Sequence, residues 1–182
     1  AGLDYIPVQA PAANQAIAVT TLLGSPVAGA NLGTTFTGQT PTGTNTLTQT
    51  STTGFDFQYS LPVEPETAVP PLDADSLNDD FAIGQISWGY FNTATPPVFQ
   101  GVPGSVGSPL VLGLQANKSM RVKVEVVDTT GAKLRFWVDL TTSLQKFSFD
   151  ISALTETSIA MVNFVSDVTN GGNAGKVTVT TA

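Results

Sequence analysis

The segment from Ser119 to Ile151 constrains the fold more than any other part of the sequence. It begins with Val122, Val124 and Val126, which alternate with charged residues. Successive side chains of a β-strand point to opposite faces, so this alternation predicts a half-buried strand. Asp128 to Gly131 follow, with a side chain that can close a turn and a glycine that can take positive φ, which predicts a hairpin.

Two further alternating runs follow that turn. The returning strand directs Leu134, Phe136 and Val138 to one face, and Phe147, Phe149 and Ile151 repeat the pattern. We expect these three strands to lie side by side in one antiparallel sheet. Their apolar face requires a second layer, because such a sheet is not stable alone in water.

The whole chain reads as all-β, a two-layer antiparallel β-sandwich of about ten strands without a helical period. Residues 1–14 contain Pro7 and Pro11 and predict an extended arm. Two divisions of the chain are compatible with these patterns. Either residues 1–53 form an arm with threonine-rich strands and residues 54–182 form the sandwich, or residues 15–182 form one continuous domain. The expected strands include residues 15–23, 54–59, 81–93, 110–115, 158–165 and 176–180.

The composition excludes several chemistries. The chain has no cysteine and no histidine, so disulfides, thiolate zinc sites and imidazole bases are absent. The carboxylates show no pattern typical of a hydrolase site, and we expect no enzymatic activity. Asn117-Lys118-Ser119 matches an N-glycosylation acceptor, a triplet that also arises by chance.

Charge is distributed unevenly along the chain, whose net charge is −7. Residues 1–117 contain no lysine or arginine, which leaves no basic stripe for nucleic acid. The contrast with the base-containing remainder predicts self-association into a homo-oligomer or polymer. No apolar run is long enough to span a membrane. A low-charge, threonine-rich chain that starts with alanine suggests a secreted, extracellular or cell-surface protein.

Three groups of residues are candidate sites. An acidic stretch offers oxygen ligands for calcium, the one cofactor considered, although its spacing is not that of an EF-hand and a solvated acidic loop is the alternative. Its residues are Asp73, Asp75, Asp79 and Asp80.

An outward-facing tryptophan with nearby aromatic and basic residues could stack a sugar, unless both faces of the strand are covered. These residues are Trp88, Tyr90, Arg135 and Trp137. The N-terminal segment from residue 1 to residue 23, which includes the arm, could add a strand to a neighbouring subunit. Its apolar residues are Tyr5, Ile6, Val8, Ile17 and Val19.

Eleven of the twenty residues from Thr34 to Thr53 are threonine. This composition suits exposed edge strands and loops, O-glycosylation or stacking against a neighbouring copy. Upstream and downstream of it, the turn Gly24-Ser25-Pro26-Val27-Ala28-Gly29-Ala30 and the strand Gly54-Phe55-Asp56-Phe57 are similar to features of secreted immunoglobulin-like and prealbumin-like modules.

From about residue 54 to 180 the chain resembles a galactose-binding-like jelly roll, the fold of many carbohydrate-binding modules. The matching segments are Phe55-Asp56-Phe57, Ser87-Trp88-Gly89-Tyr90-Phe91, Leu110-Val111-Leu112, residues 122–131, residues 147–152 and residues 159–167. The resemblance implies a fold more than a ligand. Such modules often have an acidic calcium ligand in the last strand, and this chain has Val177-Thr178-Val179-Thr180 there.

These observations lead to two functional expectations. The first is a non-catalytic structural subunit of an extracellular or surface filament, layer or matrix, joined by strand addition through the N-terminal arm. The alternative is a carbohydrate-binding module that recognises a polysaccharide through exposed aromatic residues.

Overall fold

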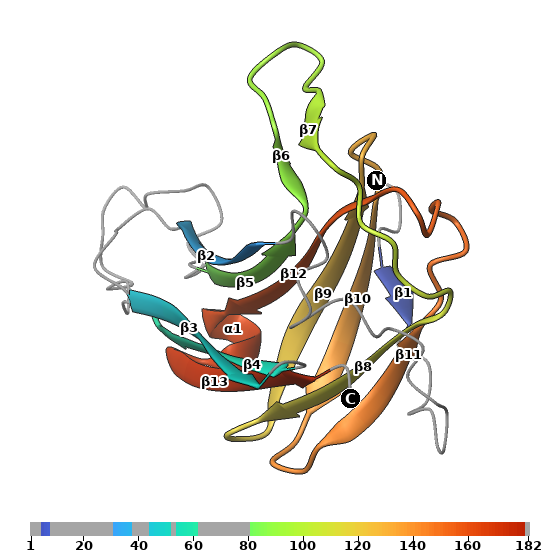
Figure 1. The fold of residues 1–182 in the computed structure, drawn as a ribbon. Helices are drawn as coiled ribbons and strands as arrows, with labels where there is room; N and C mark the ends of the chain where they lie inside the picture. Colours follow the sequence, from blue (N-terminus) through green and yellow to red (C-terminus); the bar gives the residue numbers. More distant parts are fainter. Residues whose placement is uncertain (1–4, 8–30, 38–43, 52–53, 62–80, 181–182) are drawn as a thin grey trace.

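The computed structural model describes residues 5–7, 31–37, 44–51, 54–61 and 81–180. These residues form two β-sheets packed face to face, with a two-stranded ribbon projecting from one end (Figure 1). The all-β sandwich expected from the alternating patterns is therefore confirmed. A single helical turn, α1 (Val168–Gly171), interrupts the described strands, and the side chain of Asp167 caps its first turn.

Sheet A has six strands. In spatial order they are β1 (Tyr5–Pro7), β10 (Lys133–Leu140), β9 (Met120–Asp128), β12 (Ile159–Asp167), β5 (Phe81–Ser87) and β2 (Asn31–Thr37). All neighbours are antiparallel except β1 and β10, which are parallel. Because β1 is the outermost of these strands, the described start of the chain forms one edge of sheet A.

Sheet B has five antiparallel strands. In spatial order they are β11 (Gln145–Phe149), β8 (Leu110–Ala116), β13 (Ala174–Thr180), β4 (Gly54–Ser60) and β3 (Thr44–Ser51). Two further strands, β6 (Gly89–Phe91) and β7 (Phe99–Gly101), pair only with each other in the part of the chain that the structure describes. They form the projecting ribbon at the top of Figure 1.

The connectivity from β4 onward is that of a jelly roll. The chain forms two four-stranded arrays, β11-β8-β13-β4 and β10-β9-β12-β5, by passing repeatedly between the sheets. β2 and β3 then extend the two sheets on the same side of the sandwich (Figure 1). Both precede residue 54, so described residues on each side of that position belong to one sandwich.

The core fills the space between the sheets with the inward residues of both. Phe55 of β4 contacts Phe164 of β12 edge to face, with ring centroids 5.7 Å apart. Both rings are completely buried. Burial of each such side chain stabilises the fold by about 1.5–3 kcal/mol relative to exposure.

The predicted β9–β10 hairpin is confirmed. Val124 pairs with Phe136, and the inward valines of β9 are fully buried. Asp128 Oδ1 accepts hydrogen bonds from the backbone N–H groups of Thr130 at 2.8 Å and Ala132 at 3.0 Å. Gly131 has φ of 86°, a conformation that glycine adopts without strain.

Two details of the expected strand arrangement were wrong. Residues 147–149 belong to β11, which pairs with β8 in sheet B instead of extending β9 and β10 in sheet A. Strand alternation predicts which residues face the core but not from which side they reach it. The expected long strand over residues 81–93 is divided at Trp88 into β5 and β6, because Gly89 and the ribbon leave the plane of sheet A.

Candidate functional site

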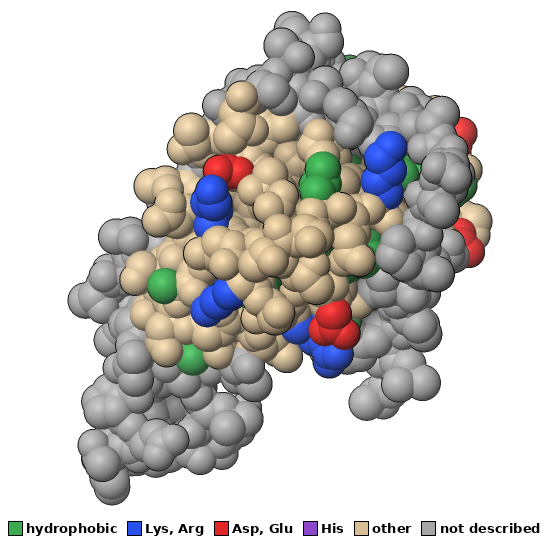
Figure 2. Space-filling view, turned by 90° about the horizontal axis from the view of Figure 1, so that it is seen from below, with side chains coloured by type: hydrophobic (Ala, Val, Ile, Leu, Met, Phe, Trp, Pro, Cys, Tyr) green, Lys and Arg blue, Asp and Glu red, His purple; other side chains and the backbone are tan. Residues whose placement is uncertain are grey.

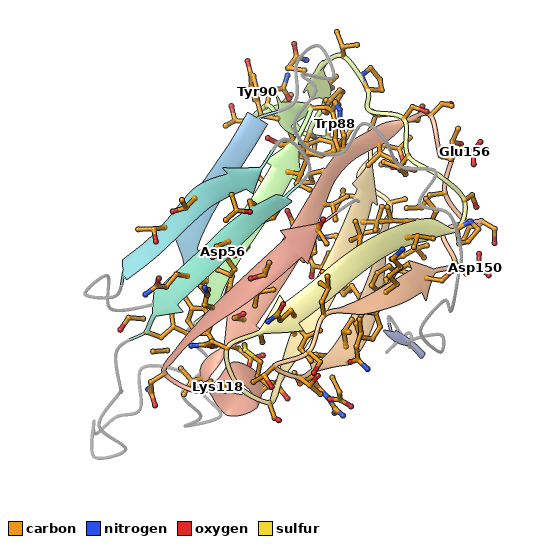
Figure 3. The ribbon with its side chains drawn as sticks, turned by 60° about the horizontal axis from the view of Figure 1, so that its bottom comes forward. Asp56, Trp88, Tyr90, Lys118, Asp150 and Glu156 are labelled. Atoms are coloured by element: carbon orange, nitrogen blue, oxygen red, sulfur yellow. The ribbon has the colours of Figure 1, made fainter. Side chains whose placement is uncertain are left out.

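The four residues predicted to contact a glycan do not come together. Trp88 is 2% exposed and belongs to the core, so the prediction that its ring offers a stacking surface was wrong. Tyr90 lies on the β6–β7 ribbon and is 65% exposed. Figure 3 shows Tyr90 and Trp88 at the same end of the sandwich. Arg135 and Trp137 lie on β10, where both are half-buried.

The ribbon, defined as residues 89–101, places its aromatic residues on two opposite faces according to the register of its two strands. Tyr90 pairs with Gln100 and Phe91 pairs with Phe99. Opposite residues of an antiparallel pair share a face, so Tyr90 and Gln100 form one face of the ribbon. Phe91 and Phe99 form the other face and contact each other edge to face, with centroids 5.7 Å apart. This aromatic pair stiffens the ribbon behind Tyr90.

The tip of the ribbon is closed by Asn92. Its Oδ1 atom accepts hydrogen bonds from the N–H groups of Ala94 at 3.2 Å and Val98 at 2.8 Å. Its own N–H donates to the carbonyl of Val98 at 3.0 Å. An asparagine that binds both ends of a loop substitutes for missing backbone pairs and orders the turn.

The base of the ribbon is held by the buried ring of Trp88. The backbone N–H of Trp88 donates to the Ala160 carbonyl at 2.9 Å, and Gly104 exchanges two backbone hydrogen bonds with Ile159. Gly104 lies directly on the indole, since a Cβ there would come within 2.3 Å of ring atoms. Gly101, at φ of 147°, lies against the Trp88 carbonyl. Glycines are required at these positions because the chain approaches the indole and its backbone so closely.

The ribbon also differs from the rest of the surface in its chemistry. Among described residues, the exposed large hydrophobic side chains are Tyr90, Val98, Val102 and Leu144, and the first three lie on or beside the ribbon. The sequence has no charged residue from 81 to 117. The ribbon therefore presents an uncharged, partly apolar surface on a chain that is otherwise acidic.

The outer face of sheet A carries a network centred on Glu125. Its Oε1 atom lies 3.1 Å from Lys123 Nζ and 3.2 Å from Arg135 Nε. Burial opposes ionisation of this carboxyl, but Lys123 and further polar partners outweigh burial and lower its pKa. The Lys123 ammonium lies 5.9 Å from the ring centre of Trp137. These groups bind one another, and Glu125 is only 8% exposed, so a ligand would have to displace existing contacts.

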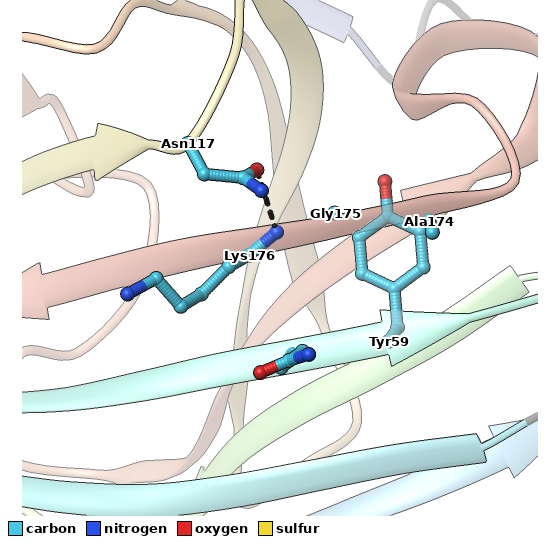
Figure 4. Close-up of a pocket in the computed structure, with 6 residues that line it drawn as sticks. Tyr59, Asn117, Ala174, Gly175 and Lys176 are labelled. Atoms are coloured by element: carbon cyan, nitrogen blue, oxygen red, sulfur yellow. Dashed lines mark hydrogen bonds between the residues drawn. The ribbon is translucent and has the colours of Figure 1, made fainter.

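The outer face of sheet B is polar and open. Figure 2 views the molecule from this side and shows charged and hydrophobic side chains scattered over it. Asp56 accepts a hydrogen bond from Thr178 Oγ1 at 2.6 Å and pairs with Lys176 at 3.1 Å. An open pocket of about 410 Å³ lies nearby between β4, β13 and the β8–β9 turn (Figure 4). Its lining residues are Gln58, Tyr59, Asn117, Ala174, Gly175 and Lys176.

The pocket is shaped by contacts of its own lining. Asn117 Oδ1 accepts the Lys176 N–H at 2.9 Å, the interaction dashed in Figure 4. The Tyr59 hydroxyl donates to the Gly171 carbonyl at 2.9 Å, and burial raises the pKa of Tyr59 to about 12. These two contacts hold Asn117 and Tyr59 in place in the wall of the pocket.

The other predicted sites are only partly within the described residues. Tyr5 and Ile6 lie in β1, paired with Arg135 and Phe136 of the same chain. The remaining predicted assembly residues (Val8, Ile17 and Val19) and the predicted calcium ligands (Asp73, Asp75, Asp79 and Asp80) lie outside the described residues. Within those residues, no cluster of three or more Asp, Glu, His or Cys could hold a metal. No helix there is long and apolar enough to cross a membrane.

Sequence reasoning missed Gln100, Asn92 and Gly104, which shape the ribbon. One signal was present, since aromatic residues at 90–91 and 99 flank a Pro-Pro turn and indicate a hairpin. The close approach of Gly104 to the indole of Trp88, sixteen residues earlier in the sequence, could not be recognised without coordinates, because it is a tertiary contact.

No protein-family model matches the sequence, and no curated protein matches it. Solved structures with a similar arrangement include the enzymatically active domain of tailspike protein 4 of bacteriophage CBA120. It is 12% identical, with a TM-score of 0.39, over 85% of this chain and 19% of that chain. An exo-β-agarase is 10% identical, with a TM-score of 0.47, over 81% of this chain and 22% of that chain.

A third structure, the protein PfGH50B, is 8% identical with a TM-score of 0.47, over 84% of this chain and 22% of that chain. The chain therefore spans only about a fifth of the length of these three proteins. Such low identities and TM-scores support no functional assignment.

Proposed function

We propose that the chain is a non-catalytic, extracellular β-sandwich module that binds a neutral polysaccharide through the β6–β7 ribbon. The observation that carries this proposal is the 65% exposed ring of Tyr90, held beside Gln100 on a ribbon that is fixed to the core by Trp88. An exposed aromatic ring on a rigid support is costly to leave in water and is typical of a recognition surface.

The chemistry of the ribbon favours a sugar as the ligand. A pyranose ring has an apolar C–H face and a rim of hydroxyl groups. The Tyr90 ring can stack on the apolar face, and the Gln100 amide can donate to and accept from hydroxyls. The charge-free stretch from residue 81 to 117 favours a neutral polymer over an anionic one.

Binding without catalysis is proposed because the ribbon itself has no carboxylate, and three described carboxylates away from it are held in ion pairs. Asp56 is paired with Lys176, Asp139 with Arg121, and Glu125 with Lys123. None of these pairs lies on the ribbon. A glycoside hydrolase needs two carboxyl groups on opposite sides of the scissile bond, and the ribbon carries no carboxylate.

The test is affinity electrophoresis of the full chain in gels that contain soluble xylan, mannan, β-glucan or agarose, with alginate as a charged comparison. We expect retardation by at least one neutral polymer and none by alginate. Tyr90→Ala should weaken binding about tenfold or more, a loss of about 1.4 kcal/mol. Leu144→Ala, which removes another exposed hydrophobic side chain (52%), should not. Equal retardation of Tyr90→Ala and the original chain would refute the proposal, as would retardation by no polymer.

A structural role is the second candidate function. The observation that favours it is the parallel pairing of β1 with β10, in which Tyr5 pairs with Arg135 and Pro7 with Trp137. The same pairing made between copies would join subunits into a filament, layer or matrix. Deleting residues 1–14 should then abolish multimers seen by light scattering. Multimers of unchanged size in the truncated chain would show that strand addition by this segment is not the means of assembly.

A further inference from the structure

The outermost strands of the two sheets differ in their protection against further pairing. An edge strand leaves one row of backbone donors and acceptors unpaired, and natural proteins block such rows with short strands, proline or lysine. On one side of the sandwich, β1 has three residues and ends at Pro7, while β11 has five residues and carries Lys146. Both edges on this side therefore have the usual protection.

The described strands on the opposite side lack this protection. β3 has eight residues, none of them charged and none proline. It pairs with β4, its only partner among the described strands, and its register is regular from Thr44 to Gln49. The neighbouring edge β2 also has neither charge nor proline in its seven residues. β2 and β3 lie next to each other on the left of Figure 1.

Two properties of β3 favour association between copies. Thr46, Thr48 and Thr50 are all exposed, and threonine pairs well with threonine across antiparallel strands. The chain carries a net charge of −7, which would oppose contact between copies. Near β3, however, the acidic residue of β4, Asp56, is paired with Lys176 at 3.1 Å. Counting only the residues that the structure describes, this edge is therefore locally close to neutral.

We propose that β3 pairs with β3 of a second copy of this chain, antiparallel across a two-fold axis, and joins two five-stranded sheets into one continuous sheet. A second copy fits this edge because it offers a strand of the same length, without charge, with threonines in matching positions. A two-fold contact of this kind is closed and self-complementary. The inference is independent of the ribbon and of the N-terminal strand, and it goes beyond both proposed functions.

The absence of cysteine from the sequence allows a direct test. Thr46→Cys, Thr48→Cys and Thr50→Cys are prepared in the full chain and oxidised, singly and in pairwise mixtures. Any disulfide is then intermolecular, and it forms readily only where Cα atoms lie about 4.4–6.8 Å apart. We expect rapid dimer formation for at least one variant or mixture, which also defines the register. Gln58→Cys, on the same face but one strand further in, is the control. Equal cross-linking of the control, or none in β3, would overturn the proposal.

Sedimentation velocity over a wide concentration range gives an independent readout. We expect a dimer whose dissociation constant rises about tenfold or more in Thr46→Lys/Thr48→Lys, because lysine on an edge strand opposes pairing. Gln58→Lys/Ser60→Lys adds the same charge to the same face of β4 and should dimerise normally. Deletion of residues 1–14 and Tyr90→Ala should also leave this dimer intact, so failure of either functional proposal is distinguishable from failure of this one. A monomer at all concentrations, or equal loss in both lysine variants, would contradict the pairing.

Discussion

Phe136 of β10 and Phe149 of β11 contact each other edge to face across the core, with ring centroids 5.1 Å apart and ring planes at 66°. The two strands follow each other in the sequence, yet they lie in different sheets. The connection through residues 141–144 carries the chain from sheet A to sheet B. Consecutive strands thus hold the two layers together through their own aromatic side chains.

Phe149→Ala should lower the free energy of unfolding by about 3–5 kcal/mol, because it leaves a cavity between the sheets at a completely buried position. Urea denaturation followed by circular dichroism measures this change. Leu144→Ala removes an exposed side chain from the preceding connection and should change stability by less than about 0.5 kcal/mol. A loss below about 1 kcal/mol for Phe149→Ala would mean that the two rings do not pack as described.

Gly104→Ala should displace the indole of Trp88, since a Cβ at this position would lie 2.3 Å from its ring atoms. We expect a loss of about 1–3 kcal/mol and a red-shifted emission of Trp88, recorded in a Trp137→Phe background that leaves one tryptophan. Ser105→Ala changes an exposed neighbour and serves as the control. Unchanged emission and stability in Gly104→Ala would show that the ribbon base tolerates a side chain.

Because of the buried hydroxyl of Tyr59, we expect the folded chain to lose stability in alkali. Burial raises its pKa in the folded state from 10.0 to about 12, so the folded chain holds this proton more tightly than the unfolded chain. The resulting stabilisation is complete below pH 10 and is lost as the pH rises through about 12, with a maximum of about 2–3 kcal/mol. Urea denaturation between pH 9 and 12 measures it. Tyr59→Phe removes the ionisable group and should show a smaller decline, whereas parallel curves would contradict the assignment.

Because of the carboxylate of Glu125, we expect the folded chain to lose stability in acid. Burial opposes its ionisation, but the charge and hydrogen bond of Lys123 and further polar partners lower its pKa below the ordinary value. The folded-state pKa is depressed, so its contribution is present above the ordinary pKa of about 4 and disappears as the pH falls through the folded value. Glu125→Gln should lower the free energy of unfolding by about 1–2 kcal/mol at pH 7. The loss is no larger because Lys123 and Arg135 are each about a quarter exposed, so water screens their charges.

The comparison for Glu125→Gln is made at two pH values. At the lower pH, below the depressed pKa of the folded state, the original carboxyl is protonated, so the two chains should unfold at the same urea concentration. Asp139→Asn, which breaks an exposed pair with Arg121, should have little effect at either pH. A difference between Glu125→Gln and the original chain that is equal at both pH values would refute an ionic contribution.

Local patterns were sufficient to predict several of the strands and the β9–β10 hairpin. The alternation of Val122, Val124 and Val126 and the turn at Gly131 depend only on strand periodicity and backbone geometry, and both are present in the structure. The position of β11 was not predictable in this way. Phe147 and Phe149 alternate identically whether the strand lies in sheet A or sheet B, and the choice depends on packing against β8.

The candidate site was predictable only in part. Tyr90 was selected as an aromatic residue at the end of an expected strand, and it is exposed. Trp88, two residues earlier, shares the same alternation but follows the inward residues of β5, so its ring enters the core. The difference arises because β5 ends at Ser87 and the chain leaves the sheet at Gly89. Sequence periodicity has no information on such a change of direction.

The ribbon is attached to the sandwich at Trp88 and Gly104, so its tip can be redesigned without changing the residues that attach it. The hydrogen bonds at this junction link Trp88 to Ala160 and Gly104 to Ile159, and none uses a side chain from the tip. Residues 90–100 could therefore be exchanged for peptides of other lengths and specificities while the indole and its glycine neighbours are retained. The module would then serve as a cysteine-free display scaffold with a single graft position.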